Sequence, residues 1–476
     1  MSARRKVVVL LSCCLSLLIV SMDATIVNVA LPHIRTDLAA GPAALQWVID
    51  VYTLVLASLL LLAGAAADRF GRRRVFQLGL TVFALGSLAC SLAPNVGALI
   101  AARLLQGVGG SMLNPVAMSI ITQVFTGRVE RARAIGVWGG VVGISMAVGP
   151  LAGGLLIDAV GWRSVFWINL PICAAAILLT ALFVPESRSA TVRAVDPVGQ
   201  LLGVAFLFGT VYVLIEGPGL GWASPVILLV AAGAVAAFAA FVRYEARHPE
   251  PFIDLRFFRS IPFTSATVTA VSAFAAWGAF LFMMSLYLQE QRGFSAMRTG
   301  LMFLPVAIGA LVFSPLSGRL VGRYGSRPSL LIAGPLMAVS AAALSWVGDA
   351  TPAGVLLAVF AVFGVGFAMV NAPITTAAVS GMPTDRAGAA SAVATTSRQI
   401  GVSIGVALCG SIAGSALAGH GAGFATAARP LWLVCALLGV VITGLGWYAT
   451  TPAAVRSAQR LAPLIESGPV RVPDGR

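Results

Sequence analysis

The sequence predicts an all-α membrane protein of fourteen transmembrane helices, arranged as two six-helix bundles with two extra central helices. Of its 476 residues, 59% are hydrophobic and only 10% are charged, and the mean hydropathy is +0.95. Soluble domains carry about 25% charged residues, so this composition excludes a water-soluble globule. Two further observations give the arrangement: the distribution of basic residues between apolar runs, and a basic turn that occurs twice.

The apolar runs define the helices, because a bilayer span needs about 20 apolar residues. The first run follows Arg4, Arg5 and Lys6 like a signal peptide, but its length and the later spans favour a retained helix. The polar segment from 451 is expected to be a loose cytoplasmic tail. The fourteen spans lie at about 7–31, 45–66, 75–93, 96–117, 133–157, 164–184, 198–216, 225–243, 262–288, 297–318, 329–347, 352–376, 388–416 and 430–450.

Basic residues are concentrated in alternate loops of this arrangement. Of the 31 Lys and Arg residues, 24 fall on one side of the membrane and 5 on the other, and Arg103 and Arg398 lie inside spans. Loops rich in Lys and Arg remain in the cytoplasm. We therefore expect a multi-pass protein of the inner (plasma) membrane with both termini cytoplasmic. The net charge of +14 then needs no nucleic-acid partner.

A short basic turn marks the duplication. It reads GAAADRFGRRRV at 64–75 and returns 254 positions later as GRLVGRYGSR at 318–327. Matching turns in two halves indicate a transporter built from parallel repeats, although two unrelated basic loops are the alternative. The offset places the extra pair of helices between the halves. The predicted divisions are 1–190 for the N-terminal bundle, 191–260 for the extra helices and linker, 261–450 for the C-terminal bundle, and 451–476 for the tail.

Three charged residues lie within the first four spans. Asp23, Asp50 and Arg103 sit at depths of about 12, 8 and 11 Å from the outer ends of their spans, at 1.5 Å per residue. Ionisable groups inside a membrane are functional candidates, and an acid beside an arginine can load and release a proton. The alternatives are a static salt bridge for Asp23 and Arg103, and an outer vestibule for Asp50.

Four residues are candidates for lining a substrate cavity: Gln106, Trp138, Met284 and Arg398. Aromatic and methionine side chains form adaptable apolar sites, and Arg398 is the one charge deep in a span of the second half. Packing against lipid or neighbouring helices is the alternative for each.

Other chemistry is disfavoured. Lys6 is the one lysine, and it lacks the glycines of a phosphate-binding loop. The six cysteines lie inside apolar runs without metal-ligand spacing, so no metal or cofactor is expected. Acids and histidines in the spans are too scattered for a catalytic set, which argues against an enzyme. A pore is disfavoured because no ring of like residues is present.

Four stretches resemble signatures of the major facilitator superfamily, in particular those of its fourteen-helix drug–proton antiporters. The resemblance covers nearly the whole chain. The stretches are 22–32, like the signature of the fourteen-helix group; 64–76, like the basic-turn signature, with Ala66 where leucine is usual; 99–111, like the signature linked to proton transfer; and 145–154, like the exporter signature, with Ser145 for its first glycine.

This resemblance implies two bundles around a central cavity, alternating access, and export of hydrophobic drugs or antibiotics in exchange for protons. The implied partners are a small hydrophobic substrate, protons and lipid, and we expect a monomer. Span 388–416 lacks the acids with which some relatives hold cationic drugs. The alternative is a dedicated exporter or proton-coupled importer of one metabolite. Implied site residues are Asp23 and Arg103 for coupling; Gly64, Asp68, Arg69, Gly71 and Arg72 for a cytoplasmic latch; and Gly149, Pro150, Gly153 and Gly154 for a hinge.

Overall fold

The chain is helical throughout the part that the computed structural model describes, which comprises residues 2–188, 196–248, 251, 253–380, 382, 387–417 and 424–466. No strand occurs in these residues, and the all-α prediction is confirmed. The helices are α1 (Ala3–Asp37), α2 (Pro42–Phe70), α3 (Arg72–Ser91), α4 (Val96–Val124), α5 (Arg128–Val160), α6 (Ser164–Trp167), α7 (Asn169–Phe183), α8 (Pro197–Leu220), α9 (Pro225–Glu245), η1 (Leu255–Arg259), α10 (Ile261–Leu286), η2 (Tyr287–Gln291), α11 (Ala296–Met302), α12 (Leu304–Tyr324), α13 (Ser326–Leu344), α14 (Ala353–Ala368), α15 (Asn371–Val379), α16 (Ala387–Leu417), α17 (Phe424–Tyr448) and α18 (Pro452–Glu466).

Each predicted span coincides with one helix or with two consecutive helices. Within the described residues, 12 helices are long and apolar enough to cross a membrane. The helices α5 and α16 are not among these 12, and α5 is represented by its shorter apolar part, Val148–Val160. A fold of many membrane spans is therefore established, and the total of fourteen crossings stays a prediction.

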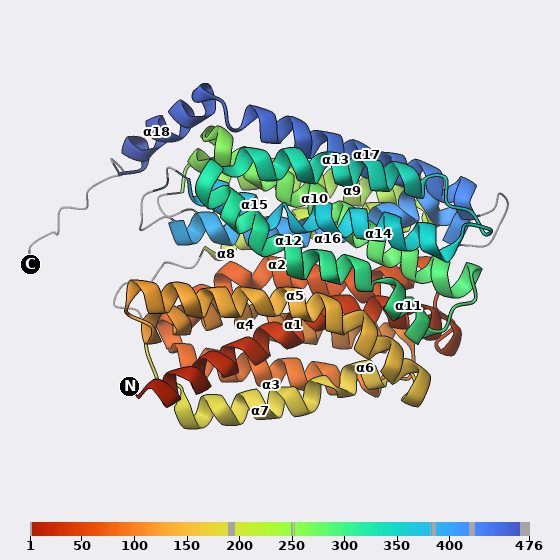
Figure 1. The fold of residues 1–476 in the computed structure, drawn as a ribbon, viewed down its shortest axis with the longest axis horizontal. Coiled ribbons are helices and arrows are strands. Elements are labelled where there is room, and N and C mark those ends of the chain that lie inside the picture. The colour runs from red at the N-terminus through yellow and green to blue at the C-terminus, as the bar shows by residue number, and fades with distance from the viewer. Residues whose placement is uncertain are drawn as a thin grey trace, which may run out of the picture.

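The helices lie side by side along the long axis of the molecule (Figure 1). Helices α1 to α7 occupy one half and α10 to α17 the other, and the start of α1 and helix α18 lie at the same end of the molecule. Helix α8 packs against α2 of the first half and α16 of the second, and α9 packs against α8. The extra pair is thus attached to the molecule through α8, which leaves most of α9 on the outside.

The glycine between the two helices of the duplicated turn has a positive φ in both halves. Gly71 separates α2 from α3 at φ +111°, and Gly325 separates α12 from α13 at φ +78°. These values lie in the region that glycine adopts without a steric penalty. The second copy therefore preserves the residue that the sharp reversal requires.

The predicted loose tail is wrong for residues 452–466, which form α18. Its buried residues Ala454, Ala458 and Leu461 recur at helical spacing and so lie on one face. Helix α18 packs against α10 and η1, and the Ser457 hydroxyl accepts a hydrogen bond from the Ile261 N–H at 3.0 Å. This segment forms a helix because its polar and apolar residues lie on opposite faces.

Candidate functional site

A buried ion pair lies at the centre of the first half. Asp23 of α1 and Arg103 of α4 have side-chain exposures of 0% and 1%. Arg103 Nη1 donates to Asp23 Oδ2, and Arg103 Nε donates to the Val48 carbonyl of α2 at 3.0 Å. Two residues 80 positions apart are therefore joined where charges are costly to bury singly.

Three neutral side chains complete this buried polar cluster of Asp23, Arg103, Gln106, Ser87 and Asn169. Gln106 Nε2 donates to Asp23 Oδ1 at 2.9 Å and to Ser87 Oγ at 2.8 Å, and its Oε1 accepts from Arg103 at 2.7 Å. Asn169 Nδ2 lies 3.3 Å from Asp23 Oδ1. The Asp23 carboxylate is therefore held by donors from two further positions besides its arginine.

Sequence reasoning missed Ser87 and Asn169 and placed Gln106 in a substrate cavity. The structure buries Gln106 completely within the buried polar cluster. An amide three residues after Arg103 lies on the same helix face, which is why Gln106 meets the same partner. Asn169 could have been noticed as an amide inside an apolar run, whereas Ser87 carries no such signal.

Aromatic rings enclose the arginine. The Arg103 guanidinium carbon lies 4.2 Å from the Tyr52 ring centroid and 6.0 Å from that of Phe166. Cations are attracted to ring faces, more so when both are shielded from water. The guanidinium thus has a carboxylate, a carbonyl, an amide and two rings as neighbours. Without the carboxylate, its positive charge would be poorly compensated.

Two glycines allow α3 and α4 to approach closely enough to place the cluster on the bundle axis. A Cβ at Gly86 would lie 2.6 Å from the Gln106 backbone nitrogen, and one at Gly109 would lie 2.3 Å from that of Phe83. Neither gap can hold a methyl group unless a backbone moves.

We expect Gly109→Ala to lower the free energy of unfolding by about 1–3 kcal/mol, because overpacking a fitted interface costs that much. The matched control is Gly136→Ala in α5, where an added Cβ meets nothing within 4 Å. It should leave stability unchanged or raise it by up to about 1 kcal/mol, because alanine favours the helix over glycine. Thermal unfolding of both detergent-purified variants checks this, and equal stability would contradict the packing argument.

Asp50 lies outside the buried polar cluster. It is completely buried on α2, which packs against α16 of the second half. Neither carboxylate oxygen accepts a hydrogen bond of good geometry in the described structure. The polar group facing Asp50 is the Ser403 hydroxyl, which is paired with Thr53 at 2.6 Å. In this conformation Asp50 is therefore buried between the two halves, and both its proton-binding role and the outer vestibule stay predictions.

The Gly-Pro stretch of α5 contacts both halves. A Cβ at Gly149 would lie 2.0 Å from Thr25 Oγ1, and one at Gly153 would lie 2.7 Å from Ile26. At Gly154 the same substitution meets the Ala296 carbonyl of α11 at 2.5 Å. The stretch therefore packs against α1 immediately after Asp23 on one side and against the second half on the other.

Polar contacts also join the two halves where α5 meets α11, at the end of the molecule opposite the start of α1 (Figure 1). Asp158 Oδ2 accepts from the Met297 N–H at 3.1 Å, and Arg35 Nη1 lies 2.8 Å from Glu290 Oε2. These contacts and the glycine packing close one end of the interface between the halves.

The chain matches the family model of the Major Facilitator Superfamily over residues 13–406. It belongs to this superfamily. It is 38% identical to the multidrug resistance protein Stp of Mycobacterium tuberculosis (strain CDC 1551 / Oshkosh) over 86% of this chain and 76% of that protein. It is 36% identical to the tetracenomycin C resistance and export protein of Streptomyces glaucescens, over 84% and 74% of the two chains.

A solved structure shares the fold. The inward-facing, occupied form of a bacterial homolog to the human lysosomal transporter Spinster aligns with a TM-score of 0.67 at 17% identity, over 97% of this chain and 99% of that chain. Superfamily membership makes this protein a membrane transporter rather than an enzyme.

The superfamily's basic-turn residues interact within the first half. Arg72 Nη2 lies 3.0 Å from Asp68 Oδ1, and its Nη1 donates to Gln123 at 3.3 Å. The Arg69 side chain is exposed. A Cβ at Gly64 would lie an ordinary 3.9 Å from Pro115, so Gly64 marks no forced approach in this conformation.

The remaining cavity candidates differ in exposure. Met284 is 1% exposed and packs in the core, so it faces no open space in this conformation, whereas Trp138 is half-buried. Arg398 Nη2 donates to Thr375 Oγ1 at 2.7 Å and to the Asn371 carbonyl at 3.3 Å. Its guanidinium lies 5.8 Å from the Phe274 ring and is in no ion pair with the described residues.

Proposed function

We propose that this transporter exports hydrophobic small molecules, such as drugs or antibiotics, in exchange for protons by alternating access. The observation that carries the proposal is the buried Asp23–Arg103 pair beside the Gly-Pro stretch of α5. The activities for which its relatives are named, multidrug resistance and tetracenomycin C export, support the substrate class.

The proposed coupling begins at Asp23. A proton on this carboxylate removes its charge and weakens the attraction of α1 to Arg103, which keeps its hydrogen bonds to Val48 and Gln106. Because Thr25 packs on Gly149, a shift of α1 is passed to α5. The same stretch of α5 then loosens or tightens on α11, so the proton state biases which end of the molecule is open.

Other site residues have proposed roles at a distance from this pair. Asp50 is a second proton-binding candidate between the halves. Arg398 and Trp138 are proposed to contact substrate, and the Asp68–Arg72 pair with Gly64, Arg69 and Gly71 is proposed as a latch at the end that holds the start of α1 and helix α18. We propose that this end is cytoplasmic, that the protein works as a monomer in the plasma membrane, and that its bundles follow the predicted divisions.

The proton gradient supplies enough energy. One proton entering across 100 mV contributes about 2.3 kcal/mol before any pH difference. Since 1.4 kcal/mol corresponds to a tenfold concentration ratio, one proton per substrate supports substantial uphill export.

Proton movement in everted vesicles tests the proposal. A pH gradient is imposed on vesicles with and without the protein, and a panel of hydrophobic antibiotics is added. Drugs that collapse the gradient in a protein-dependent way establish antiport. The antiport proposal is wrong if no drug moves protons and if a pH gradient imposed in either direction drives no drug accumulation.

A further inference from the structure

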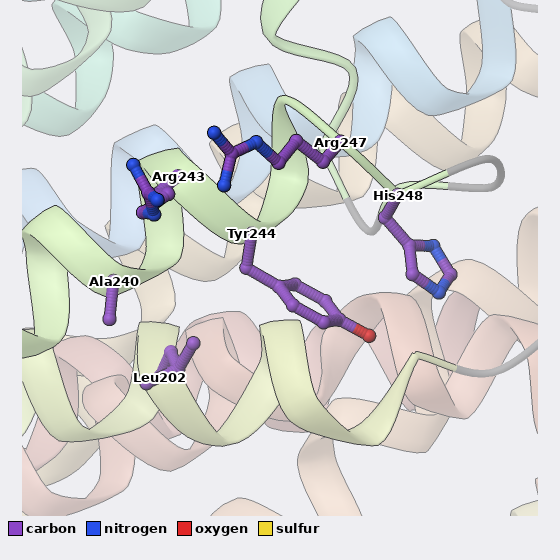
Figure 2. A pocket seen from close by; sticks show the side chains of 6 residues that line it. All are labelled: Leu202, Ala240, Arg243, Tyr244, Arg247 and His248. Atoms are coloured by element: carbon purple, nitrogen blue, oxygen red, sulfur yellow. The ribbon is translucent and has the colours of Figure 1, made fainter.

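A groove of about 440 Å³ lies between α8 and α9, away from the proposed coupling and substrate residues. Figure 2 shows its lining, with Leu202 contributed by α8 and the remaining labelled side chains by α9 and the residues that follow it. The groove is at the end of α9 that the proposed orientation places at the cytoplasmic membrane surface. Its lining residues are Leu202, Ala240, Arg243, Tyr244, Arg247 and His248.

Two unpaired cations flank the groove. Arg243 and Arg247 are four residues apart on α9 and therefore lie on one face of the helix. Both side chains are exposed, and neither is in an ion pair with another described residue. Two exposed guanidinium groups without an ion-pair partner among the described residues favour an anion at this site.

The acids described near the groove, Asp196 and Glu245, each accept a backbone hydrogen bond. Asp196 Oδ1 accepts from the Gly199 N–H at 2.9 Å and caps α8, and Glu245 Oε2 accepts from the Ile253 N–H at 3.1 Å. Both side chains are buried, so they do not neutralise the exposed arginines across the groove mouth.

Tyr244 and His248 give the groove a polar and partly rigid wall. Their rings stack with centroids 5.1 Å apart at 28°, and Figure 2 shows both rings on the side of α9 that faces α8. The imidazole N–H of His248 can donate to a phosphate oxygen, whereas the Tyr244 hydroxyl faces the Asp196 carboxylate.

The rest of the surface is apolar. Leu202 and the exposed Ala240 line the groove. Val235 and Phe238 lie one to two turns before Arg243 on α9 and are 68% and 47% exposed. A ligand that satisfies both parts carries a phosphate at the arginines and hydrocarbon along α9. Basic pockets between membrane helices at the cytoplasmic surface bind such head groups.

We propose that this groove binds an anionic phospholipid, with its phosphate between Arg243 and Arg247 and an acyl chain along α9. The bound lipid would fix the extra helix pair against the inner leaflet. The site is separate from the export cycle, so its occupancy is measurable whether or not drugs move protons.

Lipid retention by the purified full-length protein tests this proposal, by native mass spectrometry after titration with phosphatidylglycerol or phosphatidylcholine. We expect at least about tenfold preference for phosphatidylglycerol, lost in the Arg243→Gln/Arg247→Gln variant, since each surface cation attracts anionic lipid. The matched control is Arg133→Gln/Arg188→Gln, which removes two exposed arginines elsewhere. This control should retain the preference.

A second variant covers the case in which the double substitution misfolds. Ala240→Trp keeps every charge and fills the groove from its exposed side, and it should also reduce retention of phosphatidylglycerol. Equal retention of the two lipids, or unchanged preference in both groove variants, would overturn the proposal. Displacement of the lipid by millimolar inorganic phosphate would assign the site to a free anion and overturn the choice of a lipid.

Discussion

Asp23→Asn should reduce drug-dependent proton movement in everted vesicles by at least about tenfold, because an amide cannot bind and release a proton as a carboxylate does. It should also lower the free energy of unfolding by about 3–5 kcal/mol, since it leaves a buried arginine without its counter-charge. The Arg103 side chain is 1% exposed, so water cannot take the place of the carboxylate.

The variant Asp23→Asn/Arg103→Gln separates these two effects. Removing both charges of a buried pair is often nearly neutral for stability, so the double variant should recover most of the lost stability but not the proton movement. Proton movement that returns with stability would show that Asp23 has a structural role alone. If Asp23→Asn behaves like the wild type in both measurements, the coupling role passes to Asp50.

The sequence predicted the helices and the two charged partners because both have strong physical signals. Apolar length alone located the spans, and a charge within a span is costly enough to indicate function. Asp23 and Arg103 were both identified in this way, although their contact was not predictable. Depth along two helices does not fix which faces of the helices meet.

The neutral part of the cluster could not be predicted because packing decides it. Ser87 enters only because Gly86 brings α3 onto the backbone of α4, and small residues in apolar helices are too common to single out. The cavity role of Met284 stays a prediction, because it is buried in this conformation and methionine suits cavities and cores alike. Helix α18 was missed because its apolar face is formed partly by alanines, Ala454 and Ala458.

Gly154→Ala should open the end of the molecule that the structure shows closed. An added Cβ would lie 2.5 Å from the Ala296 carbonyl and 2.6 Å from Met297 Cα, and these are backbone atoms that cannot move away as a side chain can. Overpacking of this kind costs about 1–3 kcal/mol, which lowers the ratio of closed to open molecules by about 5- to 150-fold. Transport should fall several-fold, because alternating access needs both conformations.

Labelling of a cysteine at the closed end measures this shift. Ala296 is completely buried, and the native cysteines are buried as well, so Ala296→Cys reports opening over a low background. A membrane-impermeant maleimide should label it faster in the Gly154→Ala background. Gly140→Ala is the matched control, because it lies on the same helix and its Cβ would meet nothing within 4 Å. Equal labelling rates with Gly154→Ala and Gly140→Ala would mean that the contact of Gly154 with α11 does not hold this end shut, and the proposed route from Asp23 through α5 would lose its last step.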